Sequence, residues 1–212
     1  MRLILIRHGE TAWNKKGRFQ GHVGVNLNSR GFRQAQSIAR TLKPIAPRII
    51  YSSPLPRAMQ TAQAISLAYS TSIIRLDELK ELNLGKLDGL TANELQAQYP
   101  EFHQFWDKDP SRVHMPAGES LQQLQTRAWR AIDGIRKGHS EDTAVVVSHN
   151  FTITCIVCRV LGMPLSRLHR IRLDLGSFTT IQLHQRRWRL ISFNEHPHPS
   201  NYNSFRKPEK LT

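Results

Sequence analysis

Short apolar runs alternate with amphipathic stretches through residues 1–76 of this chain. The runs Leu3–Ile6, Arg48–Ser52 and Ile73–Leu76 are bounded by polar or turn-forming residues, which is typical of buried strands. Between them, apolar residues recur at helical spacing from Gly31 to Leu42 and from Arg57 to Tyr69. Strands that alternate with helices in this way predict a mostly parallel sheet with crossover helices on both faces.

The middle of the chain breaks this alternation. Residues 77–117 contain two short helical patterns, and the first begins with a capping box at Thr91. We predict that this segment forms a small helical cap, inserted over the carboxyl ends of the strands. The alternation then resumes with an amphipathic helix from Ser120 and a β-branched strand, Thr143–His149, that ends in a histidine.

The last part of the chain predicts an apolar helix that ends at Leu161, followed by a hairpin. Its strands are Phe178–His184 and Trp188–Phe193, and residues 194–212 form an irregular tail rich in Pro, Asn and Ser. A chain of 212 residues is long enough to bury one core without disulfides. The sequence therefore predicts one doubly wound α/β domain over residues 1–212.

Candidate chemistry lies at the ends of the predicted strands. Leu3–Ile6 leads into Arg7, His8 and Gly9, and the later β-branched strand ends in His149. Open α/β sheets bind their ligands at the carboxyl ends of the strands. A histidine beside a guanidinium group suits a phosphate, although the first motif alone fits a structural histidine equally well.

Arg57 adds a second, independent indication. It opens a predicted helix, where the macrodipole disfavours a cation, so an anionic partner such as phosphate is the favoured explanation. Together with Glu81, which lies in the loop before the cap, Arg57 and the two strand ends form a far more specific pattern than any one of them.

These stretches resemble the histidine phosphatase superfamily, in its phosphoglycerate mutase-like branch. The similarity covers roughly residues 1–160 and follows the order of the family. The matching stretches are Leu5–Thr11 with Asn14, Arg18–Gly21, Tyr51–Ala58 with Thr61 and Ala62, Glu81 with Gly85 and Asp88–Gly89, Gly118–Ser120, and Val146–His149.

The resemblance implies a doubly wound α/β fold and catalysis through a phosphohistidine, with no metal ion and no cofactor. His8 would be the nucleophile that attacks phosphorus. Glu81 would protonate the leaving alkoxide and then activate the water. The phosphoryl oxygens would be held by Arg7, Arg57 and His149. Further contacts with phosphate or substrate are expected from Asn14, Gln20, Gly21 and Asn150.

The acid/base role of Glu81 has a nearby alternative. Glu78 is close in the sequence, but the spacing between Glu81 and Gly85 matches the family and favours Glu81. A general acid needs a carboxyl group with a raised pKa. We expect the negative charge of the bound phosphate to be one cause of that shift.

The cap favours hydrolysis over a mutase reaction. The paired arginines and long insertion of the mutases are missing after Glu81, and basic or ionisable residues are instead spread along the cap, at Lys86, His103, Lys108, Arg112 and His114. We predict a metal-independent phosphomonoesterase that acts on a small phosphorylated metabolite. A cofactor-dependent phosphoglycerate mutase is the alternative.

The net charge of +14 admits a different class of function, because both ends of the chain are basic and attract anions. A catalytically idle scaffold that binds nucleic acid or a protein partner is therefore kept as an alternative. Nucleic acid is nevertheless not expected, since no aromatic-interleaved basic motif is present.

The apolar run at the amino terminus is too short for a signal peptide or a membrane span, which predicts a cytoplasmic protein without a membrane partner. The hairpin and tail offer a contact for a homodimer.

Overall fold

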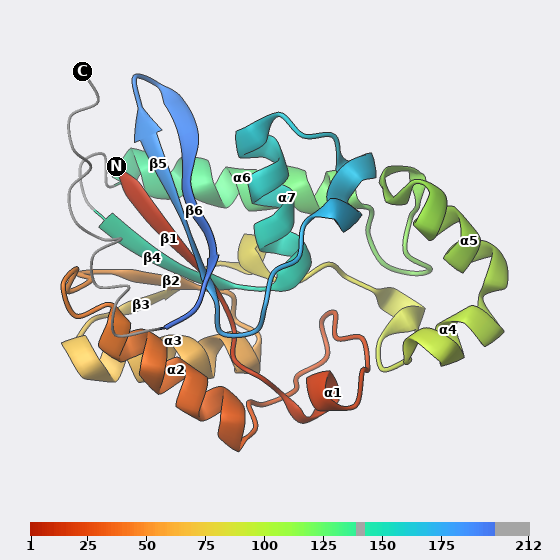
Figure 1. Ribbon diagram of the computed structural model, residues 1–212, viewed down its shortest axis with the longest axis horizontal. Helices are drawn as coiled ribbons and strands as arrows, with labels where there is room; N and C mark the ends of the chain where they lie inside the picture. The colour runs from red at the N-terminus through yellow and green to blue at the C-terminus, as the bar shows by residue number, and fades with distance from the viewer. Residues whose placement is uncertain (139–142, 198–212) are drawn as a thin grey trace.

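The computed structural model describes residues 1–138 and 143–197. In this part of the chain six strands form one sheet in the order β3-β2-β4-β1-β5-β6 (Figure 1). Strand β1 is parallel to β4, and β2 is parallel to both β4 and β3, whereas β5 is antiparallel to β1 and to β6. The strands are β1 (Arg2–Arg7), β2 (Ile50–Ser52), β3 (Ile73–Arg75), β4 (Thr143–Ser148), β5 (Phe178–His184) and β6 (Arg187–Glu195).

Two pairs of helices cover the two faces of this sheet (Figure 1). Helices α2 (Ser29–Thr41) and α3 (Pro56–Tyr69) pack on one face, and α6 (Leu121–Gly138) and α7 (Asn150–Leu161) pack on the other. The side chains of β1 alternate between the faces. Ile4 and Ile6 meet α2 and α3, while Leu3 and Leu5 meet α6 and α7. A strand buried on both faces has to be apolar throughout, so the predicted doubly wound α/β fold is confirmed.

The predicted cap is present as a series of short helices. They are η1 (Asp77–Leu79), η2 (Gly85–Leu87), α4 (Ala92–Gln98), α5 (Pro100–Lys108) and η3 (Pro110–Arg112). Thr91 caps α4, because its hydroxyl accepts from the Glu94 amide and the Glu94 carboxylate accepts from the Thr91 amide at 2.7 Å. Apolar residues of the cap pack against α7 and form a third cluster, which includes Leu82, Leu87, Leu95, Met115 and Cys155.

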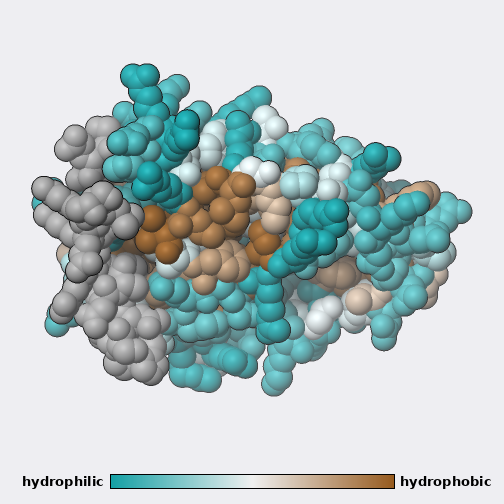
Figure 2. Space-filling view, turned by 45° about the horizontal axis from the view of Figure 1, so that its top comes forward, coloured by the Kyte–Doolittle hydropathy of each residue, from teal (hydrophilic) through white to brown (hydrophobic). Residues whose placement is uncertain are grey.

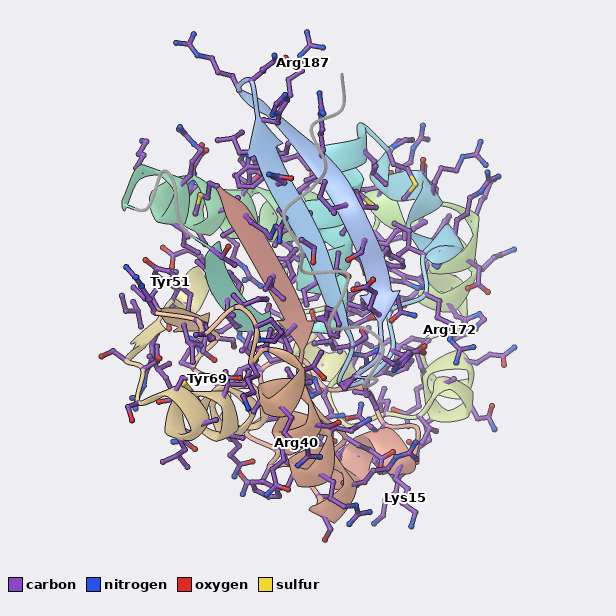
Figure 3. The ribbon with its side chains drawn as sticks, turned by 60° about the vertical axis from the view of Figure 1, so that its left-hand side comes forward. Lys15, Arg40, Tyr51, Tyr69, Arg172 and Arg187 are labelled. Atoms are coloured by element: carbon purple, nitrogen blue, oxygen red, sulfur yellow. The ribbon has the colours of Figure 1, made fainter. Side chains whose placement is uncertain are left out.

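The carboxyl-terminal hairpin extends the main sheet. Strand β5 pairs with β1 on the side that β4 leaves open, and β6 forms the edge. The turn is shorter than predicted. Gln185 and Arg186 form it alone, with φ of +46° and +64°, and Arg187 already belongs to β6. Figure 3 shows Arg187 at the far end of the hairpin, projecting from the molecule.

The prediction that an irregular tail begins at residue 194 is wrong at its start. Asn194 and Glu195 complete β6, and the Asn194 side chain binds the Asp174 loop through two hydrogen bonds. Residues 198–212 of the predicted tail lie outside the described residues.

In the described ranges no helix is long and apolar enough to span a bilayer. The face drawn in Figure 2 is hydrophilic over most of its area, with a band of hydrophobic residues across its middle.

Two further helices complete the described chain. Helix α1 (Ala12–Lys15) lies in the predicted loop after β1, and η4 (Leu165–Arg170) connects α7 to the segment before β5. The loop that contains α1 reaches the cap through Arg18, whose guanidinium donates to the Gly89 carbonyl at 2.6 Å and pairs with Glu94 at 3.0 Å. This contact brings the loop and the cap together over one end of the sheet.

Candidate active site

His8 follows directly on β1 and is almost completely buried, at 3% exposure. Its Nδ1 lies 2.7 Å from the Gly9 carbonyl oxygen. A carbonyl can only accept a hydrogen bond, so we assign the ring proton to Nδ1 and the lone pair to Nε2. Burial and the charges of Arg57 and Arg7 hold the pKa of His8 well below its usual value. The side chain is therefore a neutral imidazole whose Nε2 can act as a nucleophile.

The turn after β1 needs glycine on both sides of a close contact. A Cβ on Gly9 would lie 2.5 Å from the Gly31 carbonyl oxygen, and a Cβ on Gly31 would lie 2.1 Å from that of Glu10. Gly31 belongs to the first turn of α2, whose cap is Asn28. The two glycines thus let the start of α2 press against the turn that carries His8.

His149 occupies the equivalent position after β4. Its ring centroid lies 5.2 Å from that of His8, and it is completely buried. Its Nε2 lies 2.7 Å from the Ser53 hydroxyl oxygen, which also accepts from the Leu55 amide at 3.3 Å. The Ser53 hydroxyl still has its hydrogen to donate, and we assign the tautomer in which this hydrogen goes to Nε2 and the ring proton is on Nδ1. Burial, followed by the charge of Arg57, holds the pKa of His149 well below its usual value, so this ring is neutral too.

Arg57 is the second residue of α3 and is fully buried. Its Nε donates to Nε2 of His8 at 3.3 Å. Its terminal nitrogens donate to three carbonyl oxygens of the entrance loop, at 3.0 Å to Val23, 2.8 Å to Gly21 and 3.3 Å to Gln20. The cation at the helix start is therefore satisfied by backbone carbonyls. Burial lowers its pKa to about 10, which still leaves the group charged at neutral pH.

Unpartnered polar atoms concentrate at the predicted site. In the described ranges, buried side-chain polar atoms without a hydrogen-bond partner are Arg7 Nε, Gln20 Nε2, His149 Nδ1 and Glu195 Oε2. The first three are N–H donors of predicted site residues, given the tautomer assigned to His149. An unsatisfied buried donor costs about 1–3 kcal/mol. A site with three of them is suited to a group rich in acceptors, such as a phosphate.

Glu81 lies between η1 and η2 and is 5% exposed. Its carboxylate accepts from the amides of Leu82 at 2.9 Å, Phe151 at 3.1 Å and Thr152 at 3.2 Å, the last two in the first turn of α7. Burial raises the pKa of Glu81, although these hydrogen bonds and the charges of Arg57 and Arg7 oppose the shift. The shift is thus present without the phosphate charge that we expected to contribute to it. The sequence alternative, Glu78, is exposed on η1.

The backbone of Glu81 is held by residues that the sequence did not single out. Arg127, on α6, donates to the carbonyl oxygens of Glu78, Lys80 and Glu81, each at 2.7 Å. A half-buried ion pair with Glu119 orients its guanidinium. His22 Nε2 lies 2.8 Å from the same Glu81 carbonyl oxygen. Backbone carbonyls leave no mark in a sequence; the only available signal was the family match at Gly118–Ser120, which contains Glu119.

Three of the four predicted substrate contacts, Asn14, Gln20 and Gly21, lie in the loop after β1 and form hydrogen bonds within that loop or with the cap. Asn14 completes a capping box with Thr11 at the start of α1, with its Oδ1 accepting from the Thr11 amide at 3.0 Å. Gln20 Oε1 accepts from the Thr11 hydroxyl at 2.9 Å. Gly21 is buried, and its amide donates to the Asp88 carboxylate.

Asn150, the fourth predicted substrate contact, is half-buried and opens α7 directly after His149. Groups of three or more His, Cys, Asp or Glu side chains arranged to hold a metal ion are not found within residues 1–138 and 143–197.

The site thus combines a neutral imidazole that accepts from Arg57 with a buried carboxyl group, and the charges of Arg57 and Arg7 act on both. These groups suit the transfer of a phosphoryl group. The family model of the histidine phosphatase superfamily (branch 1) matches residues 3–196. The chain therefore belongs to that superfamily, and the predicted class of enzyme, a phosphatase, is confirmed.

Curated relatives and solved structures agree with this assignment. The chain is 34% identical to phosphoserine phosphatase 1 of Hydrogenobacter thermophilus, over 92% of each chain. It is 32% identical to the metal-independent phosphoserine phosphatase of Arabidopsis thaliana, over 94% of this chain and 83% of the relative. The solved structure of YhfR from Bacillus stearothermophilus superposes with a TM-score of 0.87 at 26% identity, over 92% of this chain and 96% of that one.

Proposed function

We propose that the protein hydrolyses the phosphomonoester of a small metabolite through a phosphohistidine on His8, with Glu81 as the acid and base. One observation carries the mechanism. His8 is buried and neutral, its Nδ1 is fixed by the Gly9 carbonyl at 2.7 Å, and its Nε2 faces the Arg57 guanidinium at 3.3 Å. A ring held in this way presents one nitrogen as a nucleophile where a cation can balance the phosphate charge.

In the first step, Nε2 of His8 attacks phosphorus and the bond to the ester oxygen breaks. The leaving oxygen takes a proton from Glu81, whose raised pKa favours the protonated form that this step needs. Arg57 Nε, which bonds Nε2 in the free enzyme, transfers its hydrogen bond to a phosphoryl oxygen. The unpartnered N–H groups of Arg7 and His149 supply further donors as charge develops.

In the second step, water attacks the phosphohistidine, gives a proton to the Glu81 carboxylate, and the bond between phosphorus and Nε2 breaks. Inorganic phosphate leaves, and both His8 and Glu81 return to their starting states. The amides of Phe151 and Thr152 stabilise the carboxylate form of Glu81 between the two steps, because they donate to it at the positive end of α7. No proton is lost or gained over the cycle beyond that of hydrolysis.

The substrate group is a phosphorylated metabolite with an alcohol as its leaving group, in line with relatives that are named phosphoserine phosphatases. The test is a phosphate-release assay over a panel of phosphomonoesters in the presence of EDTA. We expect turnover by the wild type and none by His8→Ala. Full activity of the His8 variant would overturn the mechanism.

The same assay separates the alternatives. A mutase would convert 3-phosphoglycerate into 2-phosphoglycerate without stoichiometric release of phosphate. An idle scaffold would release no phosphate from any member of the panel. Retention of the protein on DNA or RNA at physiological ionic strength would then favour the binding function.

A further inference from the structure

An apolar pocket lies in the cap beside the proposed acid. Its volume is about 180 Å³, and its walls include Phe19, Leu87, Leu95, Phe102, Trp106 and Phe151. An apolar protein cavity of about 150 Å³ is large enough for benzene. The pocket therefore has room for one six-membered ring or a short branched alkyl chain.

Aromatic rings form one side of this pocket. Trp106 meets Phe151 edge to face at 5.7 Å between ring centroids and stacks on Phe102 at 6.2 Å. The polar side chains that line the pocket, among the residues described, are His103 and Asp107, and these pair with each other at 3.4 Å. The wall thus offers π-surfaces and methyl groups, while its ionisable groups are already partnered.

The pocket adjoins the acid through Phe151. The Phe151 amide donates to the Glu81 carboxylate while its ring lines the pocket. Phe19 also lines the pocket, and it directly precedes Gln20, whose carbonyl oxygen accepts from Arg57. Displacement at phosphorus is roughly in line, so the leaving oxygen lies opposite Nε2 of His8 and next to the acid that protonates it. The rest of the alcohol then extends from Glu81 toward the pocket.

We propose that this pocket binds the alcohol part of the substrate, and that the substrate class is phosphomonoesters of alcohols with a compact apolar group, such as a phenyl ring. The proposal rests on the proposed function and adds the chemistry of the leaving group to it. An amino acid alcohol such as serine would bring an ammonium and a carboxylate group against Trp106 and Phe102. Burial of charges without partners is costly, so the wall disfavours such a substrate.

The test compares two alkyl phosphomonoesters, 2-phenylethyl phosphate and phosphoserine, by phosphate release. For the wild type we expect kcat/KM to be at least tenfold higher for 2-phenylethyl phosphate. Trp106→Ala should lower that value at least tenfold and change the value for phosphoserine less than threefold. Phe105→Ala is the matched control, because Phe105 lies on the same helix, is 59% exposed and does not line this pocket.

A second variant tests the pocket without removing any packing. Ala92 lines the pocket but is itself exposed, so Ala92→Phe fills the space from the surface. We expect Ala92→Phe to lower kcat/KM for 2-phenylethyl phosphate at least tenfold. Its inhibition constant for inorganic phosphate, which occupies the phosphoryl site alone, should stay within twofold of the wild type.

The possible failures can be told apart. If the wild type prefers phosphoserine, or if Trp106→Ala and Ala92→Phe change both substrates equally, the pocket proposal is overturned and the proposed function stands. If the wild type hydrolyses neither compound nor any other member of the panel, the proposed function fails as well. Thermal unfolding of both variants shows whether a loss of activity comes from misfolding. If one variant is misfolded, the result for the folded variant decides whether the pocket proposal holds.

Discussion

Replacement of Glu81 by glutamine separates the two chemical steps. The variant cannot donate a proton, and positioned acids contribute about 10²–10⁴-fold to a rate. We therefore expect the rate with an alkyl phosphate to fall by about that factor. With p-nitrophenyl phosphate the leaving group needs no proton, so the first step proceeds and the second, which needs a base, stalls. Stopped-flow absorbance should show a burst of about one p-nitrophenol per active site, followed by slow turnover.

The same substitution has a structural cost that the experiment has to separate. The amides of Leu82, Phe151 and Thr152 all donate to Oε1 of Glu81, a position that the glutamine carbonyl oxygen can take, but the Phe151 amide also donates to Oε2 at 3.2 Å, where an NH₂ group cannot accept. The loss of one hydrogen bond to a charged group destabilises the fold by about 1.5–3 kcal/mol, which urea unfolding measures. Glu78→Gln is the control, because Glu78 is exposed on η1 and should keep wild-type rates. A Glu81→Gln enzyme that turns over alkyl phosphates at the wild-type rate, without a burst, would refute the assignment of the acid and base.

Three smaller predictions concern the surroundings of the site. Arg127→Lys keeps the charge but loses the hydrogen bonds that hold the Glu81 backbone. The rate of the first step should fall about tenfold with alkyl phosphates and less than twofold with p-nitrophenyl phosphate, whose leaving group needs no proton. Equal losses in this step would indicate a general structural role. Burial lowers the folded-state pKa of His149, so the free energy of unfolding falls as the pH drops below about 6.5, by up to about 1.4 kcal/mol at pH 5.5. Urea unfolding at pH 7.5 and 5.5 measures this change, which should be smaller by that amount in His149→Asn than in the wild type. The same change in both proteins would contradict the lowered pKa of His149. Gly21→Ala places a Cβ 2.8 Å from both the Asp88 carboxylate and the Leu84 amide, so it should destabilise by about 1–3 kcal/mol, and an unchanged Tm would contradict the close contact.

Local patterns predicted the core of the fold because their causes are local. The run Leu3–Ile6 is apolar at every position, which only a strand covered on both faces requires, and β1 is buried in that way. The capping box at Thr91 depends on residues three apart, and it begins α4 where predicted. The ends of β1 and β4 bring His8 and His149 together because parallel neighbours end at the same edge of the sheet.

Other features depend on contacts between distant segments and could not be predicted in this way. The hairpin was predicted, but its pairing with β1 needs knowledge of which edge remains open. Its two-residue turn, Gln185 and Arg186, has positive φ at both positions without the glycine or asparagine that usually indicates it. The boundary at Asn194 shifted for a similar reason, because hydrogen bonds to Asp174 extend the order of β6.

The site shows the same division. The residue types at the site were predicted from their positions and the family pattern, but their partners were not. Arg57 was expected to need an anion, and the structure gives it three backbone carbonyls in addition to His8. The contacts of Arg127 with the segment before Glu81 are likewise made with carbonyl oxygens, which every residue type carries. Only the three-dimensional structure reveals partners of that kind.

The proposed mechanism requires His8 to carry the phosphoryl group during turnover. Glu81→Gln, mixed with ³²P-labelled p-nitrophenyl phosphate and quenched in alkali, should retain label that is stable to base and lost in acid, as a phosphohistidine is. Peptide mapping should place it on the fragment that contains His8, and the double variant with His8→Ala should retain none. If the wild type turns over substrate but neither it nor Glu81→Gln can be labelled at His8, the phosphohistidine mechanism is contradicted.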